Sequence, residues 1–495
     1  MFATGRAAAC SVVVAVVALA TGCGGAQSRF ASHMHRGEQY FAQGDLNRAR
    51  VEFRNAMQLE PHNIKARLEA GRTAEKLSMI REAAGLYQSA VDSAPDNAEA
   101  RVDLARLLVF GGAAKRALGI IEPGLARHPD DPGLLVVRAA ARAKLNDPSG
   151  ARADAERAVR LAPGDADAVA VLAGLLEQAG EKQQAITLVS NAVGRIPASA
   201  DLRQVLANLY LSAGQPESAE EQLRKLIELQ PQELPRRYEL ALLLVRTHRL
   251  DDAQRVLEEA VRSAPQSTQA KLALVDFMAA QRSNAQGVKT LRDFIARQPD
   301  NYALRIGLGE LELRSGAVQD ALATYAEVAK LDDIGPHGIN ARDRIAAIEF
   351  AQGHYDDAGK MIAVVLDNNP RDDAALTLRG AIEVERRQPT AAITDLRAVL
   401  RNQPNNLAVR RMIASAFIAD GEPALAEEQL RTALQVAPDD SPVRIGLARL
   451  LGQTGRGSEA VALLEGGVRS APADASLREA LVRADLASRD FAAAG

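Results

Sequence analysis

The chain of 495 residues contains no tryptophan, and aromatic side chains make up only 3% of it. A core built mainly from Ala, Leu and Val suits closely packed helices. The formal net charge is −3, and without a basic excess the sequence does not predict a nucleic-acid-binding face. These scarcities point to an all-α protein that does not bind nucleic acid.

The sequence also lacks the motifs of common catalytic and metal sites. It has no HExxH, GxSxG, phosphate loop or CxxC. Its seven histidines are scattered, and we interpret them as surface residues. Four acidic pairs fall in predicted turns and are interpreted as helix caps, namely Asp251-Asp252, Asp332-Asp333, Asp372-Asp373 and Asp439-Asp440. We therefore expect no enzyme activity, no catalytic residues, no metal and no cofactor.

A pattern that repeats every 34 residues extends along most of the chain. The spacing of its prolines sets the period, at positions 61, 95, 129, 163, 197, 231, 265 and 299, and again at 370, 404, 438 and 472. Counting from Phe30, position 8 of each repeat is small in most repeats, and position 20 is almost always Ala. Position 24 is large, as in Phe53 and Tyr87. Small residues at positions 8 and 20 predict two helices per repeat that approach closely.

Turn chemistry agrees with two helices per repeat. Position 15 is Gly in many repeats, as in Gly44 and Gly112, where a helix must end in a left-handed residue. Position 34 is Asp, Asn or Ser after eleven of the twelve repeat prolines, and such side chains cap the next helix.

This helix–turn–helix period resembles the tetratricopeptide repeat (TPR) family. The resemblance covers about residues 30–495 and implies an all-α, right-handed superhelical solenoid with about thirteen full repeats and part of a fourteenth. We divide it into residues 33–338 (repeats 1–9) and residues 339–495 (repeats 10–13 and the partial repeat).

Three places depart from the regular pattern of the repeat. Pro123 falls inside a second helix and predicts a kink or an early end. Residues 331–338 carry three extra residues, so we place Pro336 in a loop and expect either a hinge or a tolerated insertion. Residues 475–495 are expected to supply a first helix and, from residue 491, the start of a second. Because no capping element follows Gly495, we expect the chain to be a fragment of a longer protein or a truncated reading frame.

The N-terminus forms a separate element. Arg6 precedes an apolar run over residues 7–20, which is too short for a stable membrane span and has the layout of a secretory signal. Because it ends at Gly22-Cys23, it resembles a bacterial lipoprotein signal. The resemblance implies removal of residues 1–22, lipidation of Cys23, a polar tether over 23–32 and, with Gly24 next, anchoring in the periplasm to the outer membrane. An ordinary signal peptide is the alternative.

In TPR folds the first helices line the concave surface through positions 2, 5, 9 and 12. Residues 133–174 carry only small side chains at several of these positions, where a partner's backbone would approach closely. Asn208 has the position of the Asn in a carboxylate clamp, but Gln204 replaces the preceding base, so no clamp is predicted. The resemblance implies a partly apolar protein-binding groove formed by Met34, Phe41, Leu68, Arg72, Arg106, Asn208, Tyr238, Leu242, Leu272, Ile306 and Phe350.

Position 4 carries a base in ten repeats. One interpretation is a basic ladder, meaning a row of basic side chains along the solenoid that binds an acidic polysaccharide. The other is that the aliphatic stems pack between adjacent repeats while the charged heads pair with nearby carboxylates, because a base in the first turn opposes the helix dipole and needs a partner. The ten residues are Arg67, Arg101, Arg203, Arg237, Lys271, Arg305, Arg342, Arg410, Arg444 and Arg478.

Three functions fit the sequence. The first is a lipid-anchored scaffold that binds envelope proteins in its groove, similar to the TPR lipoproteins of exopolysaccharide export and of exosortase (PEP-CTERM) systems. The second is the substrate-docking arm of a glycosyltransferase-type enzyme whose catalytic domain lies beyond Gly495. The third is direct binding of an acidic glycan by the bases at position 4.

Overall fold

The computed structural model describes the backbone of residues 7–493 and the side chains of residues 25–487. Within these residues every regular element is a helix and no strand is present, which confirms the all-α class. The odd-numbered helices are the first helices of their repeats: α1 (Ala7–Ala42), α3 (Ile64–Lys76), α5 (Ala98–Phe110), α7 (Pro132–Lys144), α9 (Ala166–Gln178), α11 (Ala200–Ser212), α13 (Leu234–Arg246), α15 (Thr268–Gln281), α17 (Tyr302–Arg314), α19 (Pro336–Ala351), α21 (Asp373–Glu385), α23 (Leu407–Ala419), α25 (Ser441–Gln453) and α27 (Ala475–Ala493).

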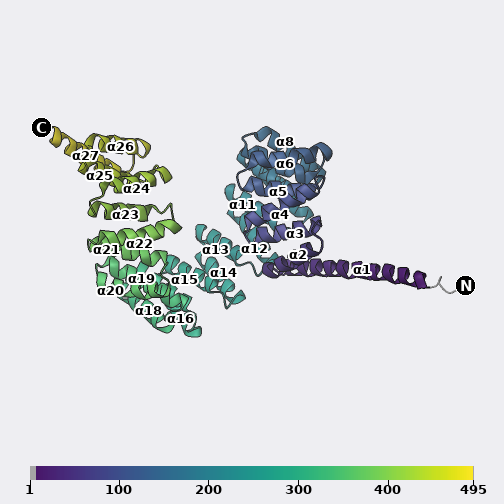
Figure 1. Cartoon of the computed structure of the whole chain (residues 1–495), viewed down its shortest axis with the longest axis horizontal. Helices are drawn as coiled ribbons and strands as arrows, with labels where there is room; N and C mark the ends of the chain where they lie inside the picture. Colours follow the sequence, from purple (N-terminus) through teal and green to yellow (C-terminus); the bar gives the residue numbers. More distant parts are fainter. Residues whose placement is uncertain (1–6, 494–495) are drawn as a thin grey trace. The chain divides into compact units, whose positions relative to one another are not determined.

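The even-numbered helices are the second helices, and each begins at position 17 of its repeat (Figure 1). They are α2 (Leu46–Leu59), α4 (Ile80–Ser93), α6 (Ala114–Arg127), α8 (Pro148–Leu161), α10 (Lys182–Arg195), α12 (Pro216–Leu229), α14 (Leu250–Ser263), α16 (Asn284–Arg297), α18 (Val318–Leu331), α20 (Tyr355–Asn368), α22 (Pro389–Asn402), α24 (Pro423–Val436) and α26 (Gly457–Ser470).

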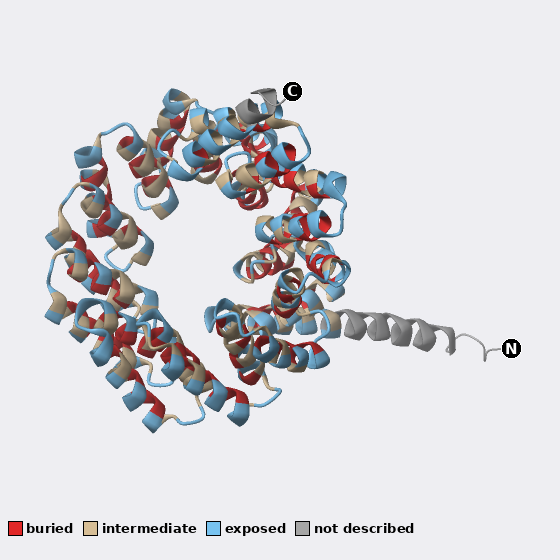
Figure 2. Ribbon diagram, turned by 90° about the vertical axis from the view of Figure 1, so that its left-hand side faces the viewer, coloured by how far each residue is buried: buried red, intermediate tan, exposed pale blue. Residues whose placement is uncertain are grey.

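The chain divides into two compact units, residues 1–256 and residues 257–495. Within each unit, consecutive helices pack against each other, and buried residues gather between the helices of a pair (Figure 2). In the second unit the core is a run of aliphatic side chains from α19 to α27, with Ile362, Leu396, Ile413 and Leu447 at most 1% exposed.

The close approach predicted within each repeat is confirmed. A Cβ atom on Gly37 would lie 2.6 Å from the Phe53 ring, so this glycine is required by the packing of position 8 against position 24. The same pair recurs in another repeat, where a Cβ atom on Gly380 would lie 2.8 Å from Leu396. Real Cβ atoms do not come this close to a neighbour, so a larger residue at position 8 would force the two helices apart.

The predicted turns and caps are also confirmed. All eight glycines at position 15 have positive φ, between 71° for Gly214 and 82° for Gly180. Four repeats use another residue there with positive φ, namely Ser78, Asn146, His248 and Arg387. Position 34 caps the next first helix, as where Asn97 Oδ1 accepts a hydrogen bond from the Ala100 amide at 2.7 Å.

The predicted early end at Pro123 is wrong. α6 continues through Pro123 to Arg127 and has the same length as its neighbours. The proline removes one hydrogen bond to residue 119, which is an exposed glycine. A Cβ atom on Gly119 would meet no atom within 4 Å, so this face of the helix is uncrowded and the helix continues past the proline.

The placement of Pro336 in a loop is also wrong, because Pro336 is the first residue of α19. The three extra residues lengthen this first helix to 16 residues, where most first helices have 13. The Asp332 carboxylate accepts hydrogen bonds from the amides of His337 and Gly338, at 2.8 and 3.1 Å, and so caps the added turn. The insertion is therefore absorbed as nearly one helical turn.

At the C-terminal end, the expected start of a second helix at residue 491 is wrong. α27 runs without a break from Ala475 to Ala493. Position 15 of this repeat is Arg489, not glycine, so the local signal that ends most first helices is missing.

At the N-terminal end, α1 is a single helix of 36 residues. The segment 25–32, which we expect to follow the lipidated cysteine, is helical and continues into the first repeat. His33 and Arg36 of α1 both contact the Glu52 carboxylate of α2, at 2.6 and 2.9 Å, and fix this helix to the first repeat. The side chain of Cys23 lies outside the described residues. Among the residues described, no helix is long and apolar enough to cross a membrane.

Candidate functional site: the inner faces of the repeats

The first helices form the inner layer of each unit. Consecutive first helices contact one another repeatedly, as in α5 with α7, α7 with α9, and α21 with α23. In the described chain, consecutive second helices make no comparable contact. The layer whose helices lie closer together is the inside of a curve, so the concave surface of each unit belongs to its first helices.

In the first unit, charged side chains cover the inner faces of α3 and α5. Arg72 donates from Nε to Asp103 at 3.1 Å and also contacts Glu69 and Glu99, at 3.0 and 2.5 Å. Burial raises the pKa of Asp103 above its ordinary value. Because each charge has a partner within the cluster, this surface is held rigid rather than left free for a ligand.

Arg106 belongs to the same surface. It donates to both oxygens of Glu75, at 2.8 and 2.9 Å, and Glu75 also accepts a hydrogen bond from the Tyr87 hydroxyl. Burial is the largest single influence on Glu75 and opposes its ionisation, but the hydrogen bonds from Arg106 and Tyr87 and the charges of Arg106 and Arg72 together outweigh burial and lower the pKa of Glu75. Arg72 and Arg106 therefore bind their own chain.

The stretch of small side chains is present on α7 and α9. Gly133, Ala140, Ala143, Ala170 and Gly174 are all half-buried. A Cβ atom on Gly174 would meet no atom within 4 Å, so space lies above the backbone there. A partner's main chain would reach this part of the inner face without obstruction.

The inner face of α11 and α13 combines amide and apolar groups around a hollow of about 290 Å³. Gln204 Nε2 donates to Asn208 at 3.2 Å and to Glu239 at 3.1 Å, which leaves no base beside Asn208 in the position a carboxylate clamp requires. Leu242 is 61% exposed at the same hollow. The Tyr238 hydroxyl is buried without a hydrogen-bond partner, and burial raises its pKa.

In the second unit, a hollow of about 320 Å³ lies between α15, α17 and α19. It is lined by Leu272, Ile306 and Gly307 on one side and by His337 and Asn340 of the lengthened helix on the other. Phe350, farther along α19, packs on Tyr355 with ring centroids 5.5 Å apart.

Three of the residues predicted to line the groove lie in the helix packing. Met34, Leu68 and Ile306 are 6%, 3% and 8% exposed, so the inner surface consists mainly of the other predicted residues. Phe41 is half-buried under the ammonium of Lys76, which lies 5.0 Å from the centre of its ring.

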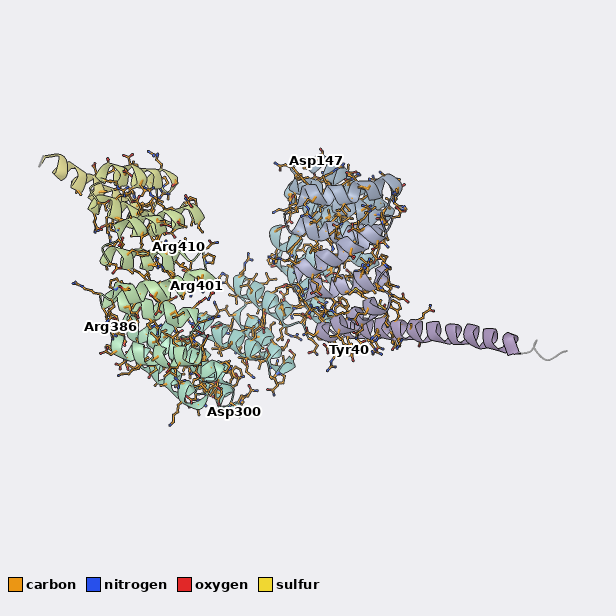
Figure 3. The ribbon with its side chains drawn as sticks, in the orientation of Figure 1. Tyr40, Asp147, Asp300, Arg386, Arg401 and Arg410 are labelled. Carbon is orange, nitrogen blue, oxygen red and sulfur yellow. The ribbon has the colours of Figure 1, made fainter. Side chains whose placement is uncertain are left out.

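The bases at position 4 are bound within the chain. Seven of them donate to the carbonyl oxygen of the repeat proline six residues earlier, as Arg203 does to Pro197 at 2.9 Å. The others of this kind are Arg67, Arg101, Arg237, Arg305, Arg410 (Figure 3) and Arg444.

Two further bases at position 4 have other partners. Lys271 donates to Gln298, and Arg342 binds the carbonyl and carboxylate of Asp333. The interpretation of position 4 as structural is therefore the one that the contacts support, although the partners are mostly carbonyl groups instead of carboxylates.

Two features were not found from the sequence. Asp343, on the inner face of α19, has a buried carboxylate oxygen with no hydrogen-bond partner, and burial with Asp372 nearby raises its pKa to about 6.

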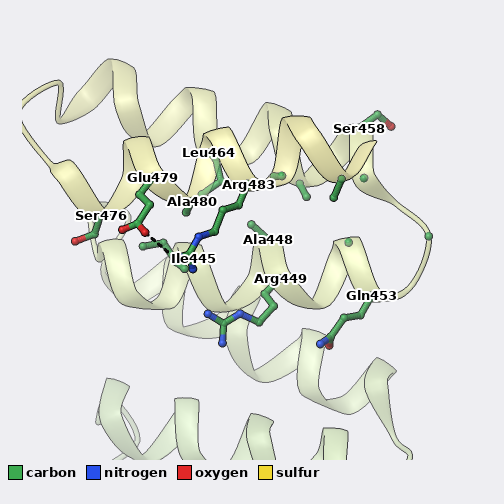
Figure 4. Close-up of a pocket in the computed structure, with 16 residues that line it drawn as sticks. Ile445, Ala448, Arg449, Gln453, Ser458, Leu464, Ser476, Glu479, Ala480 and Arg483 are labelled. Carbon is green, nitrogen blue, oxygen red and sulfur yellow. Dashed lines mark hydrogen bonds and ion pairs between the residues drawn. The ribbon is translucent and has the colours of Figure 1, made fainter. Parts of the chain in front are cut away.

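A hollow of about 840 Å³ lies between α25, α26 and α27 (Figure 4). Small residues at normally large repeat positions, Gly452 and Ala484, were the available signal for this hollow.

Most of the acidic pairs supply a helix cap as predicted. Asp372 accepts from the amides of Ala374 and Ala375, and Asp440 from that of Val443. The interpretation is wrong for Asp251-Asp252, which lies inside the first turn of α14, where Asp252 forms ion pairs with Arg249 and Arg255. Among the described residues, no group of three or more His, Cys, Asp or Glu side chains is arranged to hold a metal ion.

Two family models, both described as tetratricopeptide repeat, match the chain several times. One matches residues 77–141, 183–243, 210–277 and 417–484, and the other matches 136–200, 276–338, 345–406 and 380–442. Together they cover residues 77–338 and 345–484. The chain belongs to the tetratricopeptide repeat family.

Solved structures with a similar fold include other TPR proteins. Yeast Tom70 is 16% identical with a TM-score of 0.40, over 86% of this chain and 96% of that one. A thermophilic TPR protein of Thermus thermophilus is 25% identical with a TM-score of 0.35, over 37% of this chain and all of that one. A TPR protein of Parabacteroides merdae is 18% identical with a TM-score of 0.36, over 51% of this chain and 99% of that one.

A search of curated proteins found no match to the chain. TPR proteins generally serve as scaffolds for protein interactions, and the described chain consists of TPR helices.

Proposed function

We propose that this TPR protein is a lipid-anchored scaffold of the bacterial envelope that binds segments of other envelope proteins on its inner faces. The observation that carries the proposal is that exposed or half-buried apolar side chains occur on the inner faces of first helices, whereas the charged side chains described on these faces pair with one another. In the first unit Leu242 is 61% exposed beside a hollow and Tyr238 is half-buried, and in the second unit Leu272 and Phe350 are half-buried on first helices. Apolar groups gathered on a concave surface are typical of protein-binding sites.

The anchor rests on the sequence around Cys23. The apolar run of residues 7–20 followed by Gly22-Cys23 supports export and lipidation, and Gly24 supports sorting to the outer membrane in the periplasm. The resemblance of the first repeat to TPR lipoproteins of exopolysaccharide export and exosortase systems supports a role in exopolysaccharide assembly.

The position-4 contacts weaken the alternative of a glycan-binding ladder. A guanidinium that already donates to a proline carbonyl and to a second helix, as Arg101 does, has few donors left for a polymer. An acidic polysaccharide would have to break these hydrogen bonds to bind, so we favour protein partners.

In-cell photo-crosslinking tests the proposal. A photoreactive residue replaces Tyr238 in the first unit or Leu272 in the second, and the control replaces the exposed Glu221 of α12. We expect a discrete adduct with an envelope protein from the two inner positions and none from Glu221. Equal labelling from all three positions, or no adduct from the inner positions, contradicts the proposal.

A further inference from the structure

The hollow at the C-terminal repeats is a cavity of about 840 Å³ between three helices of the second unit. Ile445 and Ala448 of α25, Leu464 of α26, and Ala480 and Ala484 of α27 form its apolar walls (Figure 4). Its lining runs along α27 from Ser476 to Ala487, which at the rise of a helix is roughly 16 Å. This length is enough for several residues of a bound peptide.

Two positions that carry large apolar residues in several other repeats carry small residues at this cavity. Position 10 of the repeat is a buried leucine in many earlier repeats, including Leu107, Leu209, Leu311 and Leu450, whereas the last repeat has Ala484. Position 12 is often a large apolar residue, whereas repeat 13 has Gly452. Both small residues line the cavity. Position 10 is also alanine at Ala141 and Ala416, which are buried, so these small residues do not account for the whole cavity, but a larger side chain at Gly452 or Ala484 would project into it.

The charges around the cavity are unequal. Arg483 contacts Glu479 at 2.6 Å, so these two charges largely cancel. Arg449 also lines the cavity and has no ion-pair or hydrogen-bond partner for its side chain among the described residues. The cavity therefore pairs an apolar interior with one uncompensated positive charge.

We propose that this cavity binds a short peptide segment of a partner protein that carries an aliphatic or aromatic anchor next to an aspartate or glutamate. The anchor fills the volume left at Gly452 and Ala484, and the carboxylate pairs with Arg449. The inference rests on the proposed scaffold function. It specifies one binding site and the chemical class of the partner segment that binds there. A basic segment is disfavoured by Arg449, and a fully polar segment would leave the apolar walls unfilled.

The test uses the full chain and fluorescence anisotropy with a labelled synthetic peptide in which a Leu-Phe pair is flanked by Asp residues. One comparison peptide replaces Leu-Phe by Ala-Ala, and another replaces the Asp residues by Lys. We expect the acidic apolar peptide to bind. The Ala-Ala peptide should bind at least about tenfold more weakly, because burial of an apolar side chain is worth about a factor of ten or more. The Lys peptide should bind several-fold more weakly, because its charge repels Arg449.

The variant Ala484→Leu restores the side chain that position 10 has in earlier repeats, and it should block the cavity while leaving the thermal midpoint unchanged or higher. Its matched control, Ala462→Leu, adds the same side chain to an exposed position of α26. A second variant, Arg449→Glu, tests the charge, with Arg469→Glu on the exposed surface as its control. We expect peptide binding to fall at least about tenfold in Ala484→Leu and several-fold in Arg449→Glu, and to persist in both controls.

Three results of the binding assay overturn the proposal. The unmodified chain does not bind the peptide, or Ala484→Leu binds it equally well, or the Ala-Ala peptide binds as tightly as the Leu-Phe peptide. Concentration-dependent self-association that Ala484→Leu abolishes would identify a second copy of the chain as the occupant instead, and would also overturn it. The scaffold proposal is tested apart from this, because crosslinks from Tyr238 and Leu272 do not depend on this cavity.

Discussion

Arg101 Nε donates a hydrogen bond to the carbonyl oxygen of Pro95 at 2.8 Å. Its Nη1 donates to the carbonyl of Ile120 at 2.5 Å, so one side chain of α5 ties the turn that follows α4 to the second helix α6. Arg101 is only 7% exposed. The same hydrogen bond to a proline carbonyl recurs along the chain, so the side chain at position 4 fixes a first helix to the turn that precedes it.

Replacing Arg101 by Gln should therefore destabilise the solenoid. The shorter side chain cannot reach both carbonyl oxygens, so at least one part-buried hydrogen bond from a charged donor is lost. We expect the free energy of unfolding to fall by about 2 kcal/mol in urea titrations followed by circular dichroism. Arg478→Gln is the matched control, because Arg478 also stands at position 4 but is exposed and donates no described side-chain hydrogen bond. Equal stability of the two variants would show that the bonds to carbonyl oxygens contribute little.

Two glycines of first helices should respond in opposite directions to the same change. A methyl group on Gly309 would collide with the ring of Tyr325, which is fully buried, so Gly309→Ala should lower stability by about 2 kcal/mol. A methyl group on Gly174 meets no atom within 4 Å, so Gly174→Ala should raise stability by about 0.5 kcal/mol through helix propensity alone. Thermal unfolding of both variants against the parent measures the difference. A loss of stability in both would mean that the glycine at position 174 has another structural role.

The lipid anchor predicts how the protein is distributed in a cell. Cys23→Ser should move it from the membrane fraction to the soluble periplasmic fraction and abolish incorporation of a labelled fatty acid, because only the cysteine thiol receives the lipid. Cys10→Ser is the control, since the resemblance places Cys10 in the segment that is removed. Membrane association that survives Cys23→Ser would favour an ordinary signal peptide and another means of attachment.

The parts of the fold that the sequence predicts correctly are those with local signals. Gly44 must have positive φ and Asn97 must cap a helix whatever the rest of the molecule does, so the turns and helix starts follow from single positions. Pro336 was misplaced because its role depends on the capping Asp332, which turns an apparent loop into an added helical turn.

The candidate site was harder to predict, because exposure depends on how neighbouring repeats pack. Met34 and Leu68 have the register of groove residues, yet they are buried. Burial is a property of the helices around a residue and not of its own repeat position. The cavity beside Ala484 illustrates the same limit: the small residue is visible in the sequence, but whether a neighbour fills the space is decided in three dimensions.

Asp343 gives a prediction about pH. Burial, with Asp372 nearby, raises its pKa from 3.8 to about 6 in the folded protein. The folded state therefore holds a proton that the unfolded state releases, so this group makes the protein less stable as pH rises between about 4 and 6. Above pH 6 the folded protein carries a poorly solvated carboxylate, one oxygen of which has no hydrogen-bond partner.

Asp343→Asn removes this carboxylate and should raise the free energy of unfolding at pH 7.5. The full pKa shift would correspond to about 3 kcal/mol, but the group is half-exposed and solvent screens it, so we expect about 1 kcal/mol. The gain should shrink as pH falls below 6 and be small at pH 4, where the unfolded carboxyl is close to half-protonated. Urea midpoints of parent and variant between pH 4 and 8 measure it, with Asp367→Asn on the exposed surface of α20 as the control. A gain independent of pH would mean that the amide improves packing and that the charge is not the cause.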